Sequence, residues 1–361
     1  MSPIPIASDD IAATFEEAAG NEREPLVVTQ PLEAFLDEHG IGEGSLTFEP
    51  IGDGHSNVTF LVSRGDARFV LRRPPRGPLP PSAHDVNREA RILQAVAGHA
   101  RVPEVLAACS DESVIGAPFY LMEQVDGHVV TTEVPPALDT MEDRRRMGEE
   151  LIDALVEIHA VDWQAVGLEG YGKPTGYTER QVRRFTGLWE HNKTRDIPQV
   201  EKVAGWLSSN LPDSPPATIV HGDYRLGNVM MAPDAPATLN AIFDWEMSTI
   251  GDPLADLGYL CTLWVSRDDP SLGMFELTGV TREDGFPTRE ELIARYEEGS
   301  GRSMTDIRWY QTLALWKSIV FMEGNYKRAI SGATDDPYLA KFGDGVVMLA
   351  ERAEEAAFGG R

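Results

Sequence analysis

Two short segments of the chain place aspartate and asparagine side chains at a spacing that could serve chemistry. Residues 221–228 read H-G-D-Y-R-L-G-N, and residues 242–246 read I-F-D-W-E. An Asp thus lies five residues before an Asn, and a second Asp follows sixteen residues later, behind an apolar run. In phosphoryl transfer from ATP, one carboxylate orients and deprotonates the attacking hydroxyl, an amide oxygen binds a metal, and another carboxylate links the metal to the phosphates. The alternative is two surface turns that carry these residues without function.

The residue types assign a role to each of these groups. Asp223 is the expected catalytic base, and Asn228 and Asp244 are the expected ligands of Mg²⁺, which prefers carboxylate and amide oxygens. An aspartate is a weak base for an alcohol, so Asp223 would mainly position the hydroxyl and accept its proton late. Arg225 contacts the substrate or the transferring phosphoryl group, or is a solvated loop residue. Glu246 ligates a metal or holds a water beside it.

The same motifs resemble those of the aminoglycoside phosphotransferase and choline-kinase family, from about residue 31 to about residue 336. Within it, they are most similar to the kinases associated with acyl-CoA dehydrogenases, which read H-G-D-Y-R-L-x-N and I-x-D-W-E followed by G-D-P-x-x-D-L, here residues 251–257. The resemblance implies an α+β, two-lobed, protein-kinase-like fold. It has a small antiparallel sheet with a helix in the N-lobe and a larger, mainly helical C-lobe.

The resemblance also implies supporting roles and domain boundaries. Asp256 would hydrogen-bond the catalytic loop from below, and His159 would be a packing residue. Asp252 precedes a proline, which suits a helix start, and His221 is expected to brace its loop. We expect an acidic N-terminal extension over residues 1–30, a nucleotide-binding N-lobe over 31–123 and a C-lobe over 124–361.

A glycine-containing turn between two expected strands is the candidate phosphate-covering loop. Residues 52–57 read G-D-G-H-S-N. Backbone N–H groups near Gly52 and Gly54 could approach the β- and γ-phosphates closely, because glycine has no side chain. Ser56 and Asn57 would add polar contacts. A plain hairpin turn is the alternative.

The remaining nucleotide contacts are expected on a strand, a helix and a connecting segment. Arg72 stands where the family usually has a lysine, and its guanidinium can still bind phosphate oxygens. Strand alternation places it on the side of Val70, and Glu89 on the following helix is its expected partner. Glu123 and Val125 belong to the segment where a kinase has its hinge.

Composition limits the partners and the compartment. The 32 basic and 58 acidic side chains give a net charge of −26, which disfavours nucleic acid and anionic membrane as partners. Residues 1–44 hold ten acidic side chains and one basic one, whereas residues 64–91 hold seven arginines against three acids, where the phosphates are expected. Cys109 and Cys261 lie in apolar neighbourhoods and predict reduced, buried thiols in a cytoplasmic protein.

Hydrophobic periodicity predicts the elements that position these groups. Residues 1–30 show no firm period and are expected to be mobile or loosely docked. Strands are expected over 46–51, 58–63, 68–72, 119–123, 229–231 and 239–243. Helices are expected over 31–39, 85–96, 142–160, 178–192 and 290–298, and a further long helix carries Trp309 and Trp316 as core residues.

The acceptor is the least determined property. We expect its wall to come from the helical C-terminal part, with residues Tyr259, Trp264, Trp309, Trp316, Glu323, Tyr326 and Lys327. An aminoglycoside needs converging carboxylates, whereas residues 305–330 mix cations, acids and aromatic side chains. This favours a hydroxyacyl compound or its CoA thioester over an antibiotic. A nucleotide-binding pseudokinase is the alternative from another class, and a protein kinase is disfavoured because no activation segment follows Asp244.

Overall fold

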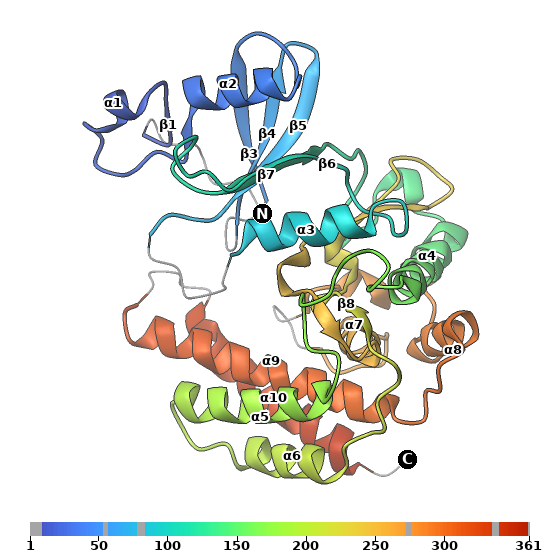
Figure 1. Cartoon of the computed structure of the whole chain (residues 1–361). Coiled ribbons are helices and arrows are strands. Elements are labelled where there is room, and N and C mark those ends of the chain that lie inside the picture. Colours follow the sequence, from blue (N-terminus) through green and yellow to red (C-terminus); the bar gives the residue numbers. More distant parts are fainter. Residues whose placement is uncertain (1–8, 53–56, 78–83, 272–275, 334–338, 360–361) are drawn as a thin grey trace. The chain divides into compact units, whose positions relative to one another are not determined.

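The computed structural model describes residues 9–52, 57–77, 84–271, 276–333 and 339–359. The chain forms two compact units, and each is described by itself. The first unit comprises Met1–Asp126 and Ala241–Glu246, and the second comprises Gly127–Asn240 and Met247–Arg361. The first is built on an antiparallel sheet and the second is mainly helical, so the predicted α+β class is confirmed (Figure 1).

The first unit holds a five-stranded antiparallel sheet with strand order β3-β4-β5-β7-β6. Its strands are β3 (Leu46–Ile51), β4 (Val58–Arg64), β5 (Ala67–Arg73), β6 (Val105–Cys109) and β7 (Phe119–Glu123). β4 and β5 are paired so that Phe60 faces Leu71 and Val62 faces Phe69. The strands β3, β4, β5 and β7 were predicted almost residue for residue, whereas β6 was missed.

Alternation along β5 gives the sheet two different faces. Phe69 and Leu71 point into a core that also contains Leu32 and Leu36 of helix α2 (Thr29–Glu38). Arg72 points to the other face, where it meets Glu89 of helix α3 (Val86–Val96; Figure 1). α3 begins where predicted, because the Asp85 side chain accepts the Arg88 N–H at 3.0 Å and caps the helix.

The N-terminal segment is an integrated part of this unit. It forms β1 (Ile11–Ala12), α1 (Phe15–Ala18) and β2 (Val27–Val28), and the two short strands pair in parallel. Val27 is fully buried in the core beneath the sheet. The expectation of a mobile or loosely docked segment is therefore wrong for residues 9–30. The apolar run that anchors it is too short to show a period in the sequence.

Three of the seven arginines expected near the phosphates instead tie the N-terminal elements together. The Arg64 guanidinium binds Asp37 at 2.6 Å, and Arg76 binds Asp10 at 2.7 Å. Arg73 is buried and donates to the backbone carbonyl of Leu26. Burial and the neighbouring Arg76 lower the pKa of Arg73 to about 10. These contacts correct the expectation that the arginine-rich stretch as a whole lines a phosphate site.

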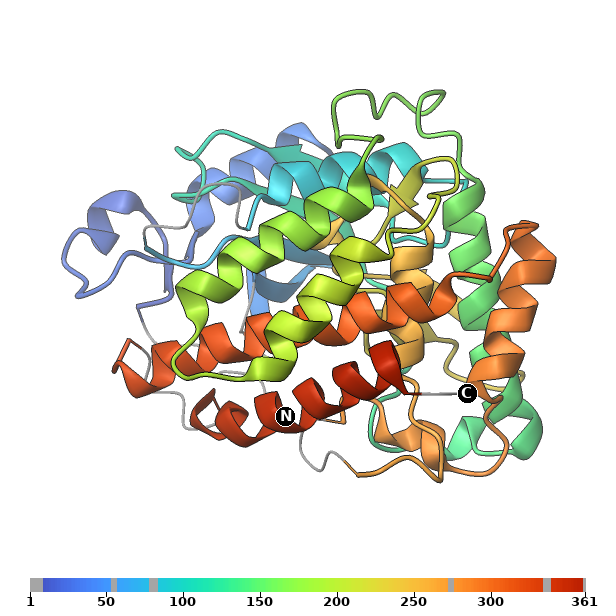
Figure 2. The ribbon, with the colours of Figure 1, turned by 90° about the horizontal axis from the view of Figure 1, so that it is seen from below.

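The second unit is a group of helices around α9. The helices are α4 (Met141–Ala160), α5 (Tyr177–Asn192), α6 (Pro198–Ser209), α7 (Leu254–Leu263), α8 (Arg289–Ser300), α9 (Ile307–Ile330) and α10 (Phe342–Phe358). α9 contacts α5, α6, α7 and α10. Figure 2 shows α5, α6, α9 and α10 side by side. The indole N–H groups of Trp309 and Trp316 donate to carbonyls of α6 at 3.1 and 3.0 Å, which confirms both as core residues.

Short strands and turns hold the loops between these helices. β8 (Thr218–Val220) pairs with β11 (Thr249–Gly251), and β9 (Val229–Met231) pairs with β10 (Leu239–Ile242). The 3₁₀ turns are η1 (Pro136–Leu138), η2 (Leu226–Asn228), η3 (Trp245–Met247), η5 (Gly279–Arg282) and η6 (Leu339–Lys341). Of the described helices, none is both long and apolar enough to cross a membrane. Cys109 and Cys261 are buried and unpaired, as predicted, and burial raises the pKa of Cys261 to about 12.

Val27→Ala tests the integration of the N-terminal segment. We expect it to lower the free energy of unfolding by about 2 kcal/mol, because it removes two buried methyl groups. Glu22→Ala on the exposed part of the same segment is the matched control and should change stability by less than about 0.5 kcal/mol. Equal denaturation midpoints for both variants would show that the segment docks only loosely.

Candidate active site

The loop that carries Asp223 is anchored by one buried carboxylate. Asp256, in the first turn of α7, accepts the backbone N–H groups of His221 at 2.7 Å and Gly222 at 2.8 Å. His159 lies 3.3 Å from the same carboxylate and 2.6 Å from the Tyr296 hydroxyl. Burial alone would raise the pKa of Asp256, but the hydrogen bonds and charges around it, led by His159, hold it below the usual value. This is the supporting role predicted for Asp256.

Further contacts fix the backbone of the loop. The Tyr224 hydroxyl donates to the Leu151 carbonyl of α4 at 2.6 Å, and the Asp223 N–H points to Nδ1 of His221 at 3.2 Å. Gly222 has a φ of +90°, and a Cβ at this position would lie 2.6 Å from the Met247 carbonyl oxygen. His221 is therefore a bracing residue, as expected, and the turn before Asp223 requires glycine.

Asp223 and Asn228 lie together at the end of this loop. Nδ2 of Asn228 donates to Oδ2 of Asp223 at 2.7 Å and to the Asp223 carbonyl at 2.8 Å. These bonds use the amide nitrogen of Asn228, so Oδ1 is the side-chain atom that could bind a cation. Nε of Arg225 lies 3.5 Å from Oδ1 of Asp223. The Asp223 side chain stays about one quarter exposed, so a substrate hydroxyl can approach it.

In the first unit, Arg72 lies between two carboxylates. Its Nε donates to Glu89 at 2.9 Å and its Nη2 to Asp244 at 2.8 Å. Burial alone would lower the pKa of Arg72, but the charges of Glu89 and Asp244 raise it above the usual value, so the guanidinium stays charged. Asn57 donates to Glu89 at 3.4 Å and to Glu246 at 3.5 Å. The structure thus pairs Arg72 with Glu89, as predicted.

Asp244 has an unusual backbone for a residue with a side chain. Its φ is +62°, in the left-handed region that costs a non-glycine residue free energy. It follows β10, and the Ile242 N–H donates to the Arg101 carbonyl at 2.8 Å, which fixes the end of the strand. Such strain is retained where a side chain must point in one direction. Here it aims the carboxylate at Arg72.

The other predicted nucleotide residues are only partly described. Gly52 has a φ of +87°, and among the described residues other than its chain neighbours no atom lies within 4 Å of the position a Cβ would take. Gly54 and Ser56 lie outside the described residues. The Glu123 side chain accepts the Glu104 N–H at 3.0 Å. In the described part of the chain, neither backbone polar group of Val125 has a hydrogen-bond partner.

The residues suited to metal binding offer one amide and one carboxylate. Among the described residues, no three His, Cys, Asp or Glu side chains cluster as a metal site. In the second unit, Asn228 bonds Asp223 through Nδ2 and not through Oδ1, and in the first unit, Asp244 bonds Arg72 through Oδ1 and not through Oδ2. Each of the two remaining oxygens is of the kind that a hard cation such as Mg²⁺ prefers.

A cavity of about 400 Å³ in the second unit adjoins Asp223. Its wall is largely apolar, with side chains from α7, α9 and α10. The apolar lining residues are Met247, Leu263, Val265, Leu277, Leu313, Leu315, Phe321, Met322, Phe342 and Leu349. Its size and lining are typical of a small-molecule site. Because Asp223 lies in its wall, the cavity is the candidate acceptor site.

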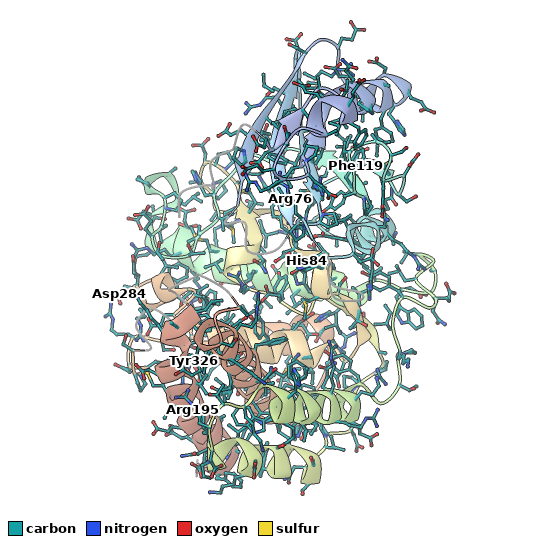
Figure 3. The ribbon with its side chains drawn as sticks, turned by 90° about the vertical axis from the view of Figure 1, so that its left-hand side faces the viewer. Arg76, His84, Phe119, Arg195, Asp284 and Tyr326 are labelled. Atoms are coloured by element: carbon teal, nitrogen blue, oxygen red, sulfur yellow. The ribbon has the colours of Figure 1, made fainter. Side chains whose placement is uncertain are left out.

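Most residues expected in the acceptor wall lie elsewhere. Tyr259 lines the cavity, but Trp264, Trp309 and Trp316 are buried in the core with their N–H groups bonded to carbonyls. Three further residues join α9 to the last turn of α5 and the segment after it: Glu323 accepts from Thr194, Lys327 donates to the His191 carbonyl, and Tyr326 packs under Arg195 at 5.1 Å (Figure 3). The expected wall is therefore wrong at these six positions.

Lys317 lines the cavity, although the sequence analysis assigned it no role. It lines the same cavity as Asp223 and lies on α9, between Leu313 and Phe321 one turn away on either side. The sequence signal is a single charged side chain within residues 312–322, which read T-L-A-L-W-K-S-I-V-F-M.

The chain matches the model of the phosphotransferase enzyme family over residues 47–302. It is also 36% identical over 330 residues to mouse acyl-CoA dehydrogenase family member 10. That alignment covers 90% of this chain but only 30% of the mouse protein. The chain therefore spans less than a third of the length of this relative.

Solved structures give a similar result. A protein from Ralstonia eutropha JMP134, named for the aminoglycoside phosphotransferases, superimposes with a TM-score of 0.80 at 32% identity, covering 91% of this chain and 97% of that one. A mutant aminoglycoside phosphotransferase in a ternary complex with AMP-PNP and hygromycin B has a TM-score of 0.57 at 15% identity, covering 92% and 100%. At 15% identity, this second match shows a similar fold and nothing more.

Gly222→Ala tests the turn that presents Asp223. The added Cβ would meet the Met247 carbonyl in a backbone conformation that alanine avoids, so we expect a loss of roughly 1–3 kcal/mol in the free energy of unfolding. Gly187→Ala in the exposed middle of α5 is the control, with open space around the Cβ. It should be neutral or stabilise the protein by up to about 1 kcal/mol. Chemical denaturation of both variants measures the difference. Equal denaturation midpoints would contradict the requirement for glycine at position 222.

Proposed function

This chain belongs to the phosphotransferase enzyme family, whose members are small-molecule kinases, and we propose that it moves the γ-phosphate of ATP to a hydroxyl group in a Mg²⁺-dependent reaction. The observation that carries the proposal is the Asp223–Asn228 pair. Asn228 holds the carboxylate of Asp223 through Nδ2 and keeps an oxygen free for a cation. The pair adjoins a cavity of suitable size for an alcohol.

Asp223 is the proposed catalytic base. The acceptor oxygen forms a bond to the γ-phosphorus while the bond from that phosphorus to the β,γ-bridging oxygen breaks, and ADP leaves with the electron pair. The hydroxyl proton passes to a carboxylate oxygen of Asp223 and then to solvent. Arg225, beside Asp223, is positioned to contact the acceptor or the transferring group.

Asn228 and Asp244 would hold Mg²⁺ through their free oxygens. The bound ion would neutralise charge on the phosphates. Arg72 binds one oxygen of Asp244 and keeps it oriented, and its fork of donors could also bind phosphate oxygens. The backbone around Gly52 and Gly54, with Ser56 and Asn57, would cover the phosphates. The backbone N–H and C=O of Val125, which have no hydrogen-bond partner in the described part of the chain, would bind the edge of the adenine ring.

The proposed acceptor is a hydroxyacyl compound or its CoA thioester. The apolar wall of the cavity supports this choice, and so does the similarity to a protein named for acyl-CoA dehydrogenases. The alternative acceptor, an aminoglycoside, would need several unpaired carboxylates around the cavity. The pseudokinase alternative conflicts with the presence of Asp223, Asn228 and Asp244. Two unpaired buried thiols support a cytoplasmic location as part of the same proposal.

Asp223→Asn tests the base. The amide keeps the size of the side chain but accepts no proton, so we expect turnover of a hydroxyacyl acceptor to fall by about 10²–10⁴-fold. Binding of ATP with Mg²⁺, measured by isothermal titration, should stay nearly intact. Asp234→Asn in the exposed turn before β10 is the control and should behave as wild type. Normal turnover by Asp223→Asn would contradict its role, and no ATP binding by wild type would favour a pseudokinase.

Arg72→Ala tests phosphate binding. We expect the affinity for ATP to fall by about tenfold to a hundredfold while the affinity for adenosine is kept, because ATP has phosphate oxygens that a charged donor can bind and adenosine has none. Arg72→Lys keeps the charge but not the fork that spans Glu89 and Asp244, so it should recover part of the affinity. Titration with both ligands separates the roles. Equal weakening of ATP and adenosine would show that Arg72 acts only in the packing of the unit.

A further inference from the structure

The charged side chains that face the acceptor cavity differ in whether they have hydrogen-bond or ion-pair partners inside the protein. Each carboxylate in the wall has partners inside the protein: Asp256 accepts backbone N–H groups of the catalytic loop, and Asp223 accepts from Asn228. Glu276 receives two donors of Arg282, at 2.6 and 3.0 Å. The cavity therefore offers little free negative charge to a cationic ligand.

Lys317 differs from these carboxylates. In the described part of the chain its ammonium makes no ion pair and no hydrogen bond, and its polar contact is the face of the Phe185 ring at 4.9 Å. A cation over an aromatic face is only partly compensated for the water it has lost. An oxygen anion or a strong carbonyl dipole entering the cavity would supply the missing partner.

The position of Lys317 on α9 explains why it is half-buried. Leu313 and Phe321 lie four residues before and after it, on the same side of the helix, and all three line the cavity. Burial lowers the pKa of Lys317 to about 8, and the charge of Asp256 opposes this effect only in part. A bound anion would raise the pKa again by favouring the charged form. The cavity thus combines an apolar wall, a general base and one unpartnered cation.

We propose that Lys317 determines the acceptor specificity by binding the acyl oxygen of an apolar, hydroxylated substrate whose hydroxyl reaches Asp223. The inference rests on the proposed function and deepens it. The acyl oxygen belongs to a free carboxylate or to a thioester carbonyl, and both accept from an ammonium. The same cation repels polyammonium ligands, because specificity also arises from a like charge placed against the wrong partner.

Binding without ATP tests this assignment independently of phosphate transfer. The probes are octanoate, octanoyl-CoA and octanol, titrated by calorimetry into wild type, Lys317→Met and Lys317→Arg. We expect Lys317→Met to weaken octanoate or octanoyl-CoA by about tenfold to a hundredfold, and Lys317→Arg to recover most of the affinity. Octanol, which has no acyl oxygen, should bind all three proteins equally. If Lys317→Met loses affinity only for octanoate, the group that Lys317 binds is a free carboxylate. If it loses affinity only for octanoyl-CoA, the group is a thioester carbonyl.

Lys327→Met is the matched control on the same helix. Lys327 donates to the His191 carbonyl outside the cavity, so its loss should not change binding of any probe. Thermal melting of Lys317→Met should show an intact fold, because methionine fills the apolar site without a charge. Equal binding of the acyl probes by wild type and Lys317→Met, or no binding of them by wild type, would overturn the inference.

The outcomes also separate the inference from the proposed function. Binding of the acyl probes that depends on Lys317, without phosphate transfer to any hydroxyacyl acceptor, would leave the inference standing and refute the kinase proposal. Phosphate transfer with an unchanged KM for the acceptor in Lys317→Met would refute only the role of Lys317.

Discussion

A carboxylate taken out of water must be supplied with hydrogen-bond donors, and Asp256 obtains them from the loop that precedes Asp223. Two successive backbone N–H groups and the His159 ring surround it, and the start of α7 adds its positive dipole end. These contacts leave the loop one conformation, in which Gly222 takes a left-handed φ and Asp223 faces the cavity. The candidate base is thus positioned by a charge that does no chemistry itself.

In the first unit, the buried charge that needs partners is positive. Arg72 is a buried cation, and Glu89 and Asp244 satisfy it from two different elements. Removing any one member would leave a buried charge without its partner, which is costly. Arginine in place of the lysine typical of this family has a physical consequence here. Its fork spans two carboxylates at once, whereas an ammonium is a compact point charge.

Both units therefore place satisfied charges beside their functional side chains, and Lys317 is the exception. Among the described residues that line the cavity, it is a cation whose compensation comes from an aromatic ring. The expected acceptor wall failed for a related reason. Large aromatic residues on α9 were assigned to it, but α9 is surrounded by other helices, so its tryptophans fill the core.

The sequence predicted the bounds of a helix or strand correctly where the hydrophobic pattern of that element alone determines it. The strands β3 and β7 match their predicted bounds, because alternation or a short apolar run between turn residues is a local signal. α3 was predicted from the helical spacing of its apolar residues, and the structure adds the Asp85 cap. β6 and α10 were missed. β6 reads V-L-A-A-C and shows no alternation of polar and apolar residues in the sequence, and α10 is rich in small alanines and glycines whose burial depends on the helices beside it.

By itself, the sequence determined which residues are candidates for the chemistry: Asp223, Asn228 and Asp244 by their spacing, Arg72 with Glu89 as its partner, and Asp256 as the support of the loop, because phosphoryl transfer would restrict residue type and order. Only the tertiary structure decided what is buried against what. It brought Val27 into the core of the sheet unit, turned Arg73 and Arg76 toward the N-terminal segment and placed Lys317 in the wall beside Asp223. Burial and pairing depend on contacts between distant segments, which no local pattern encodes.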